Sequence, residues 1–216
     1  MDAAGCTAKI ITLNPHLLND VLDNIRQLGD AVGAQRIAES LIDSLLLRTT
    51  AVRSAMARVD RPRVLTIEWI DPIMPGGHWV PEIVEIAGGT SQPIAPGQPS
   101  SKVPWEDLRE LRPEVVVLMP CGFGPERAAM EAEVLWSLPG WALLPAVQKG
   151  RVFVVDGNAH FSRPGPRLID GLEILAHILH PARWRRPAFG SVFKLVSPPA
   201  GASSVENWAP RFEQLL

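Results

Sequence analysis

The chain has 216 residues but no tyrosine and only two cysteines, Cys6 and Cys121. Two cysteines this far apart form no disulfide framework, zinc knuckle or C-x-x-C redox motif. An excess of charge is also missing, since 21 Lys and Arg stand against 23 Asp and Glu. A nucleic-acid partner would need a local basic patch, for which Arg183, Arg185 and Arg186 are the candidates. We expect no nucleic-acid partner.

Long apolar runs are lacking as well. No stretch approaches the roughly 20 apolar residues of a membrane-spanning helix, so we expect no membrane insertion. Residues 1–13 (MDAAGCTAKIITL) have no basic segment ahead of a continuous apolar one and predict no secretory signal, which leaves the compartment unassigned. The composition, 46% apolar and 20% charged, is that of a globular protein and excludes disorder of the whole chain.

The first quarter of the chain predicts a short strand and then helices. Residues 8–13 favour a strand, and Asn14-Pro15 predicts an N-cap with proline at the first helical position. Apolar residues then recur at helical spacing in two stripes: Leu17, Leu18, Val21, Leu22, Ile25 and Leu28, and Ile37, Leu41, Ile42, Leu45, Val52 and Met56.

From residue 62 onward, strands alternate with helices. The pattern predicts strands at 64–69, 114–119 and 152–155, each followed by a helix, at 80–87, 125–138 and 167–179. Continuous apolar runs such as VVVL and VFVV are typical of parallel strands buried on both faces. We therefore expect a three-layer α/β lobe (α-β-α) with a mostly parallel sheet over 62–180. This lobe is preceded by a terminal strand and connector helices in residues 1–61. It is followed by a loosely ordered, Pro-rich tail, residues 181–216. Residues 88–103 predict a loop.

Ligands of such sheets bind beyond the carboxyl ends of the strands, so the three segments that follow the strands are the candidates for function. The first is 68–82, EWIDPIMPGGHWVPE. Its Trp69, His78 and Trp79 beside Gly-Gly favour an apolar floor for a large planar ligand, because glycine allows close approach and tryptophan supplies area. The alternative is a tryptophan packed under a loop.

The second segment, 118–126 (LMPCGFGPE), holds Phe123 between two glycines. Its cysteine, Cys121, is either a nucleophile activated by His78 or His160 or an inert small hydrophobe. The first alternative would make the protein a Cys/His-dependent hydrolase or transferase. No third orienting residue can be assigned, and the segment lacks the pattern of a phosphate loop.

The third segment, 156–167 (DGNAHFSRPGPR), is polar and aromatic. We expect His160 and Phe161 at the mouth of the sheet, Ser162 as an N-cap, and Arg163 or Arg167 within reach of an anionic or amide group. The acidic and histidine side chains of the three segments lack the i, i+4 or H-E-x-x-H spacing that gathers metal ligands, so we assign no metal site.

Several long motifs in these segments carry a resemblance: RVLTIEW (63–69) with GHWVPE (77–82), VLMPCGF (117–123), and GRVFVVDG (150–157) with FSRPGPR (161–167). Over about residues 9–181 the chain resembles the vitamin B12-binding subgroup of class III solute-binding proteins of ABC transporters, which share the cobalamin/iron-siderophore periplasmic-binding fold. That fold has two α/β lobes joined by a long helix. The resemblance assigns 14–59 to this connector and the following helix, and the lobe to the C-terminal one, with the N-terminal lobe missing.

The resemblance implies a non-enzymatic protein that binds a cobalamin-like corrinoid, as the substrate-binding component of ABC-type uptake or a truncated derivative of it. The implied partners are the corrinoid and an ABC transporter permease; no cofactor is required. A siderophore or haem on the same fold is the alternative. The expected ligand-binding residues are Glu68, Trp69, His78, Trp79, Met119, Cys121, Phe123, His160, Phe161, Ser162 and Arg163.

The missing lobe also suggests an assembly. Without it, Leu17, Val21, Ile25 and other residues of the helical stripes would be uncovered, and large exposed apolar patches are rare in soluble monomers. We therefore expect a homodimer or a partner chain to cover them.

Overall fold

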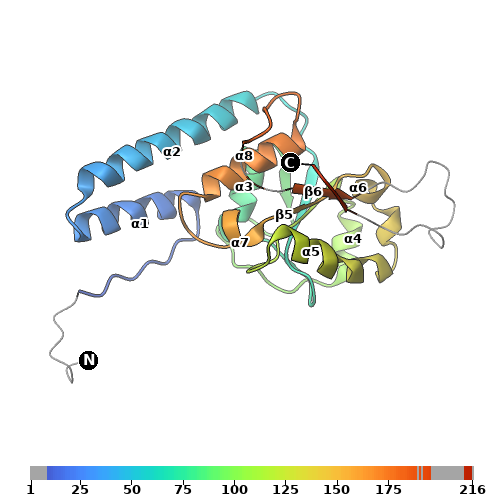
Figure 1. Cartoon of the computed structure of the whole chain (residues 1–216). Coiled ribbons are helices and arrows are strands. Elements are labelled where there is room, and N and C mark those ends of the chain that lie inside the picture. Colours follow the sequence, from blue (N-terminus) through green and yellow to red (C-terminus); the bar gives the residue numbers. More distant parts are fainter. Residues whose placement is uncertain (1–8, 189, 191, 196–211, 216) are drawn as a thin grey trace, which may run out of the picture.

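The computed structural model describes residues 9–188, 190, 192–195 and 212–215 (Figure 1). Its strands are β1 (Arg63–Trp69), β2 (Met74–Pro75), β3 (Thr90–Gln92), β4 (Val115–Leu118), β5 (Val152–Val155), β6 (Val192–Leu195) and β7 (Phe212–Gln214). Its α-helices are α1 (Leu18–Ala31), α2 (Gln35–Ala55), α3 (Val80–Ile86), α4 (Trp105–Glu110), α5 (Pro125–Glu131), α6 (Pro145–Gln148), α7 (Gly157–His160) and α8 (Leu168–Leu179). Two 3-10 helices, η1 (Ala132–Ser137) and η2 (Trp141–Leu143), follow α5.

The strands form one mixed sheet whose centre is parallel. Strand β1 pairs in parallel with β3 and β4, and β4 pairs in parallel with β5. The antiparallel strands β2, β6 and β7 extend the sheet at its edges. The predicted mostly parallel sheet is confirmed, and all three predicted strands lie in it.

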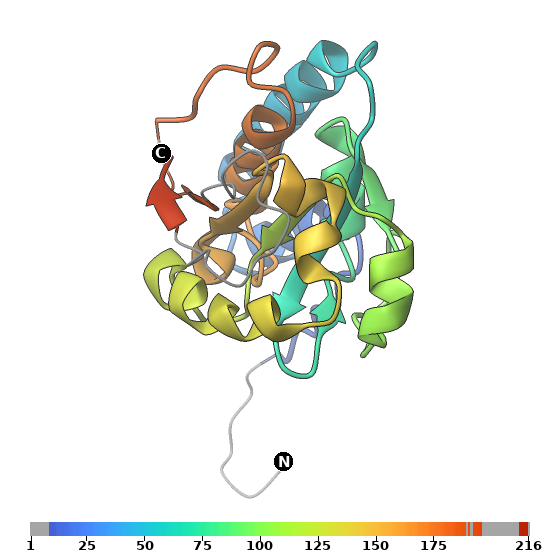
Figure 2. The same ribbon diagram turned by 90° about the vertical axis from the view of Figure 1, so that its right-hand side faces the viewer.

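Side chains of the central strands alternate between two cores, as the two-residue period of a strand requires. Val115, Val117 and Val155 face the core under α1, α2, α3 and α8. Val116, Leu118 and Val154 face the core under α4, α5 and α6. The result is the expected three layers, with helices on both faces of the sheet (Figure 2).

The helical region before the sheet folds as an antiparallel hairpin of α1 and α2, which projects to one side of the lobe (Figure 1). A Cβ on Gly29 would lie 2.5 Å from the Ala38 Cβ, so the close crossing of the helices requires glycine there. Arg48 of α2 fixes the hairpin to α8 through ion pairs with Asp170 at 2.7 Å and Glu173 at 2.9 Å.

This hairpin corrects the expectation for part of the apolar stripes, although Leu28 and Ile37 remain exposed. Val21 is only 3% exposed and belongs to the core, while Ile25 is half-buried and packs against it. Leu17 is half-buried too. The inward side of α1 thus lies on the lobe itself. The need for a homodimer or partner to cover these three residues disappears.

Four local predictions are wrong. Residues 9–13 form no strand, and α1 begins at Leu18 rather than at Pro15, because the Asp20 carboxylate accepts the N–H groups of His16 and Leu17. The predicted loop 88–103 contains β3, which completes the edge of β1. Strands β6 and β7 lie in the tail expected to be loosely ordered and pair with the sheet. Residues 1–8, 189, 191, 196–211 and 216 lie outside the described residues.

Within the described residues, none of the helices is both long and apolar enough to span a bilayer.

The start of α1 gives a test of stability. Backbone hydrogen bonds from His16 and Leu17 lower the pKa of Asp20, so the folded state gains stability above the ordinary carboxyl pKa and loses it as the pH falls through the lowered value. We expect Asp20→Asn to cost about 0.5 to 1 kcal/mol at neutral pH, because the site is near solvent. The difference from the parent should vanish in acid, measured by urea unfolding. Asp43→Asn, an exposed change on α2, is the control and should change stability little at either pH.

Candidate functional site

The three candidate segments meet at the carboxyl edge of β1, β4 and β5. The Cys121 N–H donates to the Glu68 carbonyl at 3.0 Å, and the Asn158 N–H donates to the Phe123 carbonyl at 3.4 Å. A Cβ on Gly157 would collide with the carbonyl oxygens of Met119 and Pro120. Glycine at this position therefore lets the third segment lie directly on the second. The sheet brings the segments together as predicted.

One end of this edge is aromatic. Trp69 is 39% exposed, and its ring centroid lies 5.9 Å from that of Phe123. The Trp69 Nε1–H donates to the Asp71 carbonyl at 2.9 Å, which fixes the orientation of the indole. The Arg127 guanidinium carbon lies 3.8 Å from the Phe123 centroid, a cation–π geometry. Both rings therefore have a defined orientation on the edge of the sheet.

A hollow of about 220 Å³ lies beside the two rings. Besides Trp69 and Phe123, its lining consists of Ile70, Asp71, Pro120, Glu131 and Val134. The hollow is smaller than the 300–1,000 Å³ of typical ligand pockets, so it would hold only part of a large planar ligand.

The middle of the edge is polar. A Glu68 carboxylate oxygen accepts the Gly77 N–H at 3.2 Å, which ties the end of β1 to the Gly-Gly turn. Cys121 is exposed at its surface, with the Ser162 hydroxyl beside its thiol. Burial raises the pKa of the Cys121 thiol, the Ser162 hydroxyl lowers it, and the Glu68 charge raises it. The thiol is therefore poorly ionised at neutral pH.

The other end of the edge is formed by two histidines. His78 has a left-handed backbone (φ 51°), an uncommon conformation that its N–H to the Gln98 carbonyl and its carbonyl from the Gly97 N–H hold in place. Its ring centroid lies 5.3 Å from that of His16. Both rings are half-buried.

Four predicted site residues lie beneath the edge rather than on it. Met119 is in the core, Phe161 is 2% exposed, and Trp79 is 8% exposed with its Nε1–H donated to the Phe161 carbonyl at 2.8 Å. His160 is 9% exposed rather than projecting at the mouth, and burial lowers its pKa by disfavouring the imidazolium. For Trp79 the alternative of a tryptophan packed under a loop holds, and these side chains support the edge.

The third segment differs from expectation in its capping. Asp156, not Ser162, caps a helix here, accepting the Ala159 N–H at 2.7 Å. The Ser162 hydroxyl donates to the Gly157 carbonyl at 2.8 Å and closes the turn of α7. Arg163 is exposed and donates to the Asn158 side-chain oxygen at 3.2 Å. It remains at the surface of the site.

Neither nucleophilic catalysis nor metal binding gains support from this geometry. In the part of the chain that the structure describes, no three His, Cys, Asp or Glu side chains gather as a metal site. The groups that affect the pKa of Cys121 are Ser162 and Glu68, neither of which is the histidine that a thiolate nucleophile needs.

Two residues of the site, Arg127 and His16, were not predicted from the sequence. Arg127 lies in the first turn of α5, and only the position of Phe123 before that helix hinted at their contact. His16 lies just before α1, and its approach to His78 joins residues 62 positions apart, which no local pattern reveals.

The family model described as periplasmic binding protein matches residues 4–159, most of the chain. The chain belongs to the periplasmic binding protein family. This is a family of non-enzymatic solute-binding proteins. A comparison with curated proteins returned no match.

Solved structures agree with the family. The haem complex of IsdE from S. aureus superposes with a TM-score of 0.70 at 18% identity, over 79% of this chain and 68% of that one. The periplasmic vitamin B12-binding protein BtuF of Vibrio cholerae gives 0.64 at 21%, over 82% and 66%. An ABC-type Fe3+-hydroxamate transport protein from Saccharomonospora viridis gives 0.64 at 26%, over 77% and 57%. This chain thus spans 57% to 68% of the length of these three structures.

The polar middle of the edge gives a second test. Because the Cys121 pKa is raised, we expect alkylation by iodoacetamide to be slow at neutral pH and to accelerate only in alkali. Glu68→Gln removes the nearby negative charge and should lower the pKa, whereas Ser162→Ala should raise it further. The rate against pH, measured in a Cys6→Ser background, checks both signs. Fast alkylation at neutral pH would contradict the assigned environment.

Proposed function

We propose that the chain binds a cobalamin-like corrinoid at the carboxyl edge of β1, β4 and β5. The observation that carries this proposal is the exposed pair of Trp69 and Phe123, already oriented beside a hollow. Flat aromatic rings held in place bury a large planar ligand at little cost in conformational entropy. Ligand binding without catalysis also accords with the family, whose members are non-enzymatic solute-binding proteins.

The polar middle of the edge suits the periphery of such a ligand. Glu68, Ser162 and Arg163 offer an acceptor, a hydroxyl and a cation next to the aromatic pair. These groups would recognise amide side chains at the rim of a corrin ring, whereas the rings of Trp69 and Phe123 contact its face. Cys121 would contribute as a small neutral surface, because its thiol is protonated.

The structural relatives support this class of ligand, since they include proteins described as binding vitamin B12, haem and Fe3+-hydroxamate. A haem is the second candidate on the same edge. The adjacent imidazoles of His16 and His78 favour it, because a histidine side chain is one of the protein ligands of haem iron.

We further propose that the lobe at 62–180 is the ligand-binding unit, and that it delivers its ligand to an ABC transporter permease. The three segments of the proposed site and the strands that position them all lie within these bounds.

Titration with cyanocobalamin tests the corrinoid proposal. We expect cobalamin to quench tryptophan fluorescence and to bind about fivefold more weakly for each of Trp69→Ala and Phe123→Ala, since each lost stacking face costs about 1 kcal/mol. Equilibrium dialysis followed by visible absorption gives the affinities. Leu143→Ala, a truncation of an exposed apolar side chain on η2, is the control and should leave binding unchanged.

The same titration with haemin and with a ferric hydroxamate identifies the ligand class. A corrinoid site predicts saturable binding of cyanocobalamin that His78→Ala weakens no more than Trp69→Ala does. Tighter binding of haemin, lost in His78→Ala together with its Soret shift, would replace the corrinoid by haem. If the Trp69 and Phe123 variants bind every probe like the parent, the proposed edge is not the site.

A further inference from the structure

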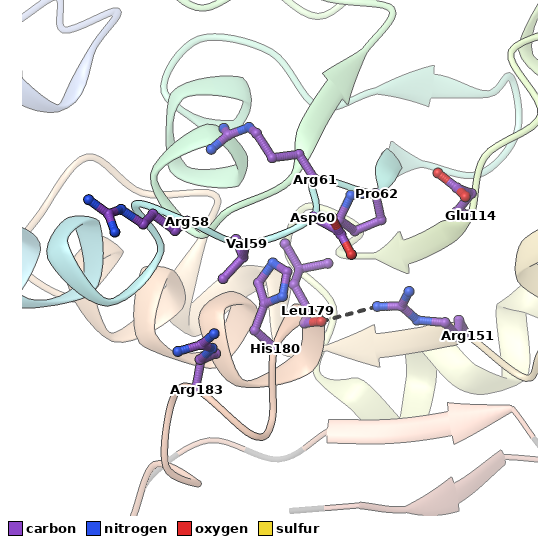
Figure 3. Close-up of a pocket in the computed structure, with 10 residues that line it drawn as sticks. All are labelled: Arg58, Val59, Asp60, Arg61, Pro62, Glu114, Arg151, Leu179, His180 and Arg183. Atoms are coloured by element: carbon purple, nitrogen blue, oxygen red, sulfur yellow. Dashed lines mark hydrogen bonds between the residues drawn. The ribbon is translucent and has the colours of Figure 1, made fainter.

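A second hollow lies at the opposite end of the sheet. Its volume is about 550 Å³, within the range of small-molecule sites. Pro62, Glu114 and Arg151 in its lining directly precede β1, β4 and β5, so this pocket lies at the amino ends of the same strands. The connection from α2 supplies Arg58, Val59, Asp60 and Arg61, and the end of α8 supplies Leu179, His180 and Arg183 (Figure 3).

The charge of this amino-edge pocket is strongly positive. Four arginines line it, and none of them forms an ion pair within the described part of the chain. Of its two acids, Glu114 is already committed to Arg63, through an ion pair at 3.4 Å and a backbone hydrogen bond at 3.1 Å. Four guanidinium groups therefore face two carboxylates, Asp60 and Glu114, and the Glu114 charge still acts on Arg151.

The arginines differ in how firmly they are held. Arg61 donates to the carbonyls of Glu85 and Gly89, both at 2.7 Å. Arg151 donates to the Leu179 carbonyl at 3.2 Å, and burial lowers its pKa because the cation is partly removed from water. Arg58 and Arg183 are exposed. Figure 3 shows Arg183 with His180 on one side of the pocket and Arg151 on the other.

We propose that this pocket binds an anion bearing a phosphate or diphosphate group. A guanidinium presents a planar set of donors that matches phosphate oxygens, and Arg151 keeps most of its donors after the single bond to Leu179. An anion would also help to neutralise a partly desolvated cation that forms no ion pair within the described residues. The open, polar lining does not suit the planar apolar ligand assigned to the carboxyl edge, so the two sites select different chemistry.

Arg185 and Arg186, which follow Arg183 in the sequence, are also exposed. With Arg183 they make up the basic patch that the sequence marks, and the concave shape of the pocket at Arg183 favours a phosphorylated small molecule over a nucleic acid. The same phosphate chemistry has two sources, a soluble metabolite or an anionic lipid headgroup, and the experiment separates them.

Calorimetric titration of the whole chain with inorganic pyrophosphate tests the proposal. Loss of one charge-assisted contact should weaken binding about tenfold, so we expect this effect from Arg151→Gln and from Arg183→Gln. Arg183 is exposed and forms no side-chain hydrogen bond within the described residues, so its variant tests the site even if Arg151→Gln disturbs α8. Arg36→Gln, the same charge change at the far end of α2, is the matched control.

Competition identifies the source of the phosphate. Displacement of pyrophosphate by a nucleoside diphosphate, but not by phosphatidylglycerol vesicles, assigns a soluble ligand; displacement by the vesicles assigns a lipid headgroup. No saturable binding, or equal weakening by Arg36→Gln, overturns the proposal. Cobalamin titrations of the Arg183 variant should match the parent, so failure here and failure at the carboxyl edge are distinguishable.

Discussion

Burial of the parallel strands on both faces is the constraint on which the rest of the structure depends. Val115, Val116, Val117 and Leu118 are wholly buried, as are Val152, Val154 and Val155. With one core on each side, none of these side chains can contact a ligand. Function is thereby confined to the two ends of the strands, where backbone turns expose side chains. The two ends carry opposite chemistry: aromatic rings and a thiol at one, arginines at the other.

The sequence predicted the structure correctly where a local pattern has a single physical cause, as in strands that are buried on both faces. Continuous apolar runs predicted the buried strands, and the ends of the strands located the candidate site, including Trp69, Cys121 and Phe123. The sequence did not show which aromatic residues beyond the strand ends are exposed and which are buried. Trp69 and Trp79 have similar neighbours in sequence, but Trp79 is buried because its indole N–H finds the Phe161 carbonyl across 82 positions. No pattern within one segment reports such a partner.

The edges of the sheet were missed for a related reason. Strand β3 has three residues in a stretch rich in Pro, Gly and Ser, and it exists because Thr90, Ser91 and Gln92 find the free edge of β1. The hairpin of α1 and α2 was predicted as helix, but the contact of Arg48 with Asp170 and Glu173 decides where it packs. The pairing of β3 and the packing of the hairpin both depend on contacts with residues distant in sequence. The local propensity of each segment is compatible with these contacts but does not predict them.

The distance between the two ends decides whether they act as one site or two. At about 3.3 Å per residue, the seven residues of β1 separate its ends by about 23 Å and the four of β5 by about 13 Å. Both exceed the Debye length of about 8 Å at physiological ionic strength, so the charge of an anion at the amino edge is largely screened at the carboxyl edge. The intervening strands are packed on both faces and offer no second arrangement that one ligand could select. Occupancy of one end should therefore leave the affinity of the other unchanged, which makes the lobe a scaffold with two independent surfaces.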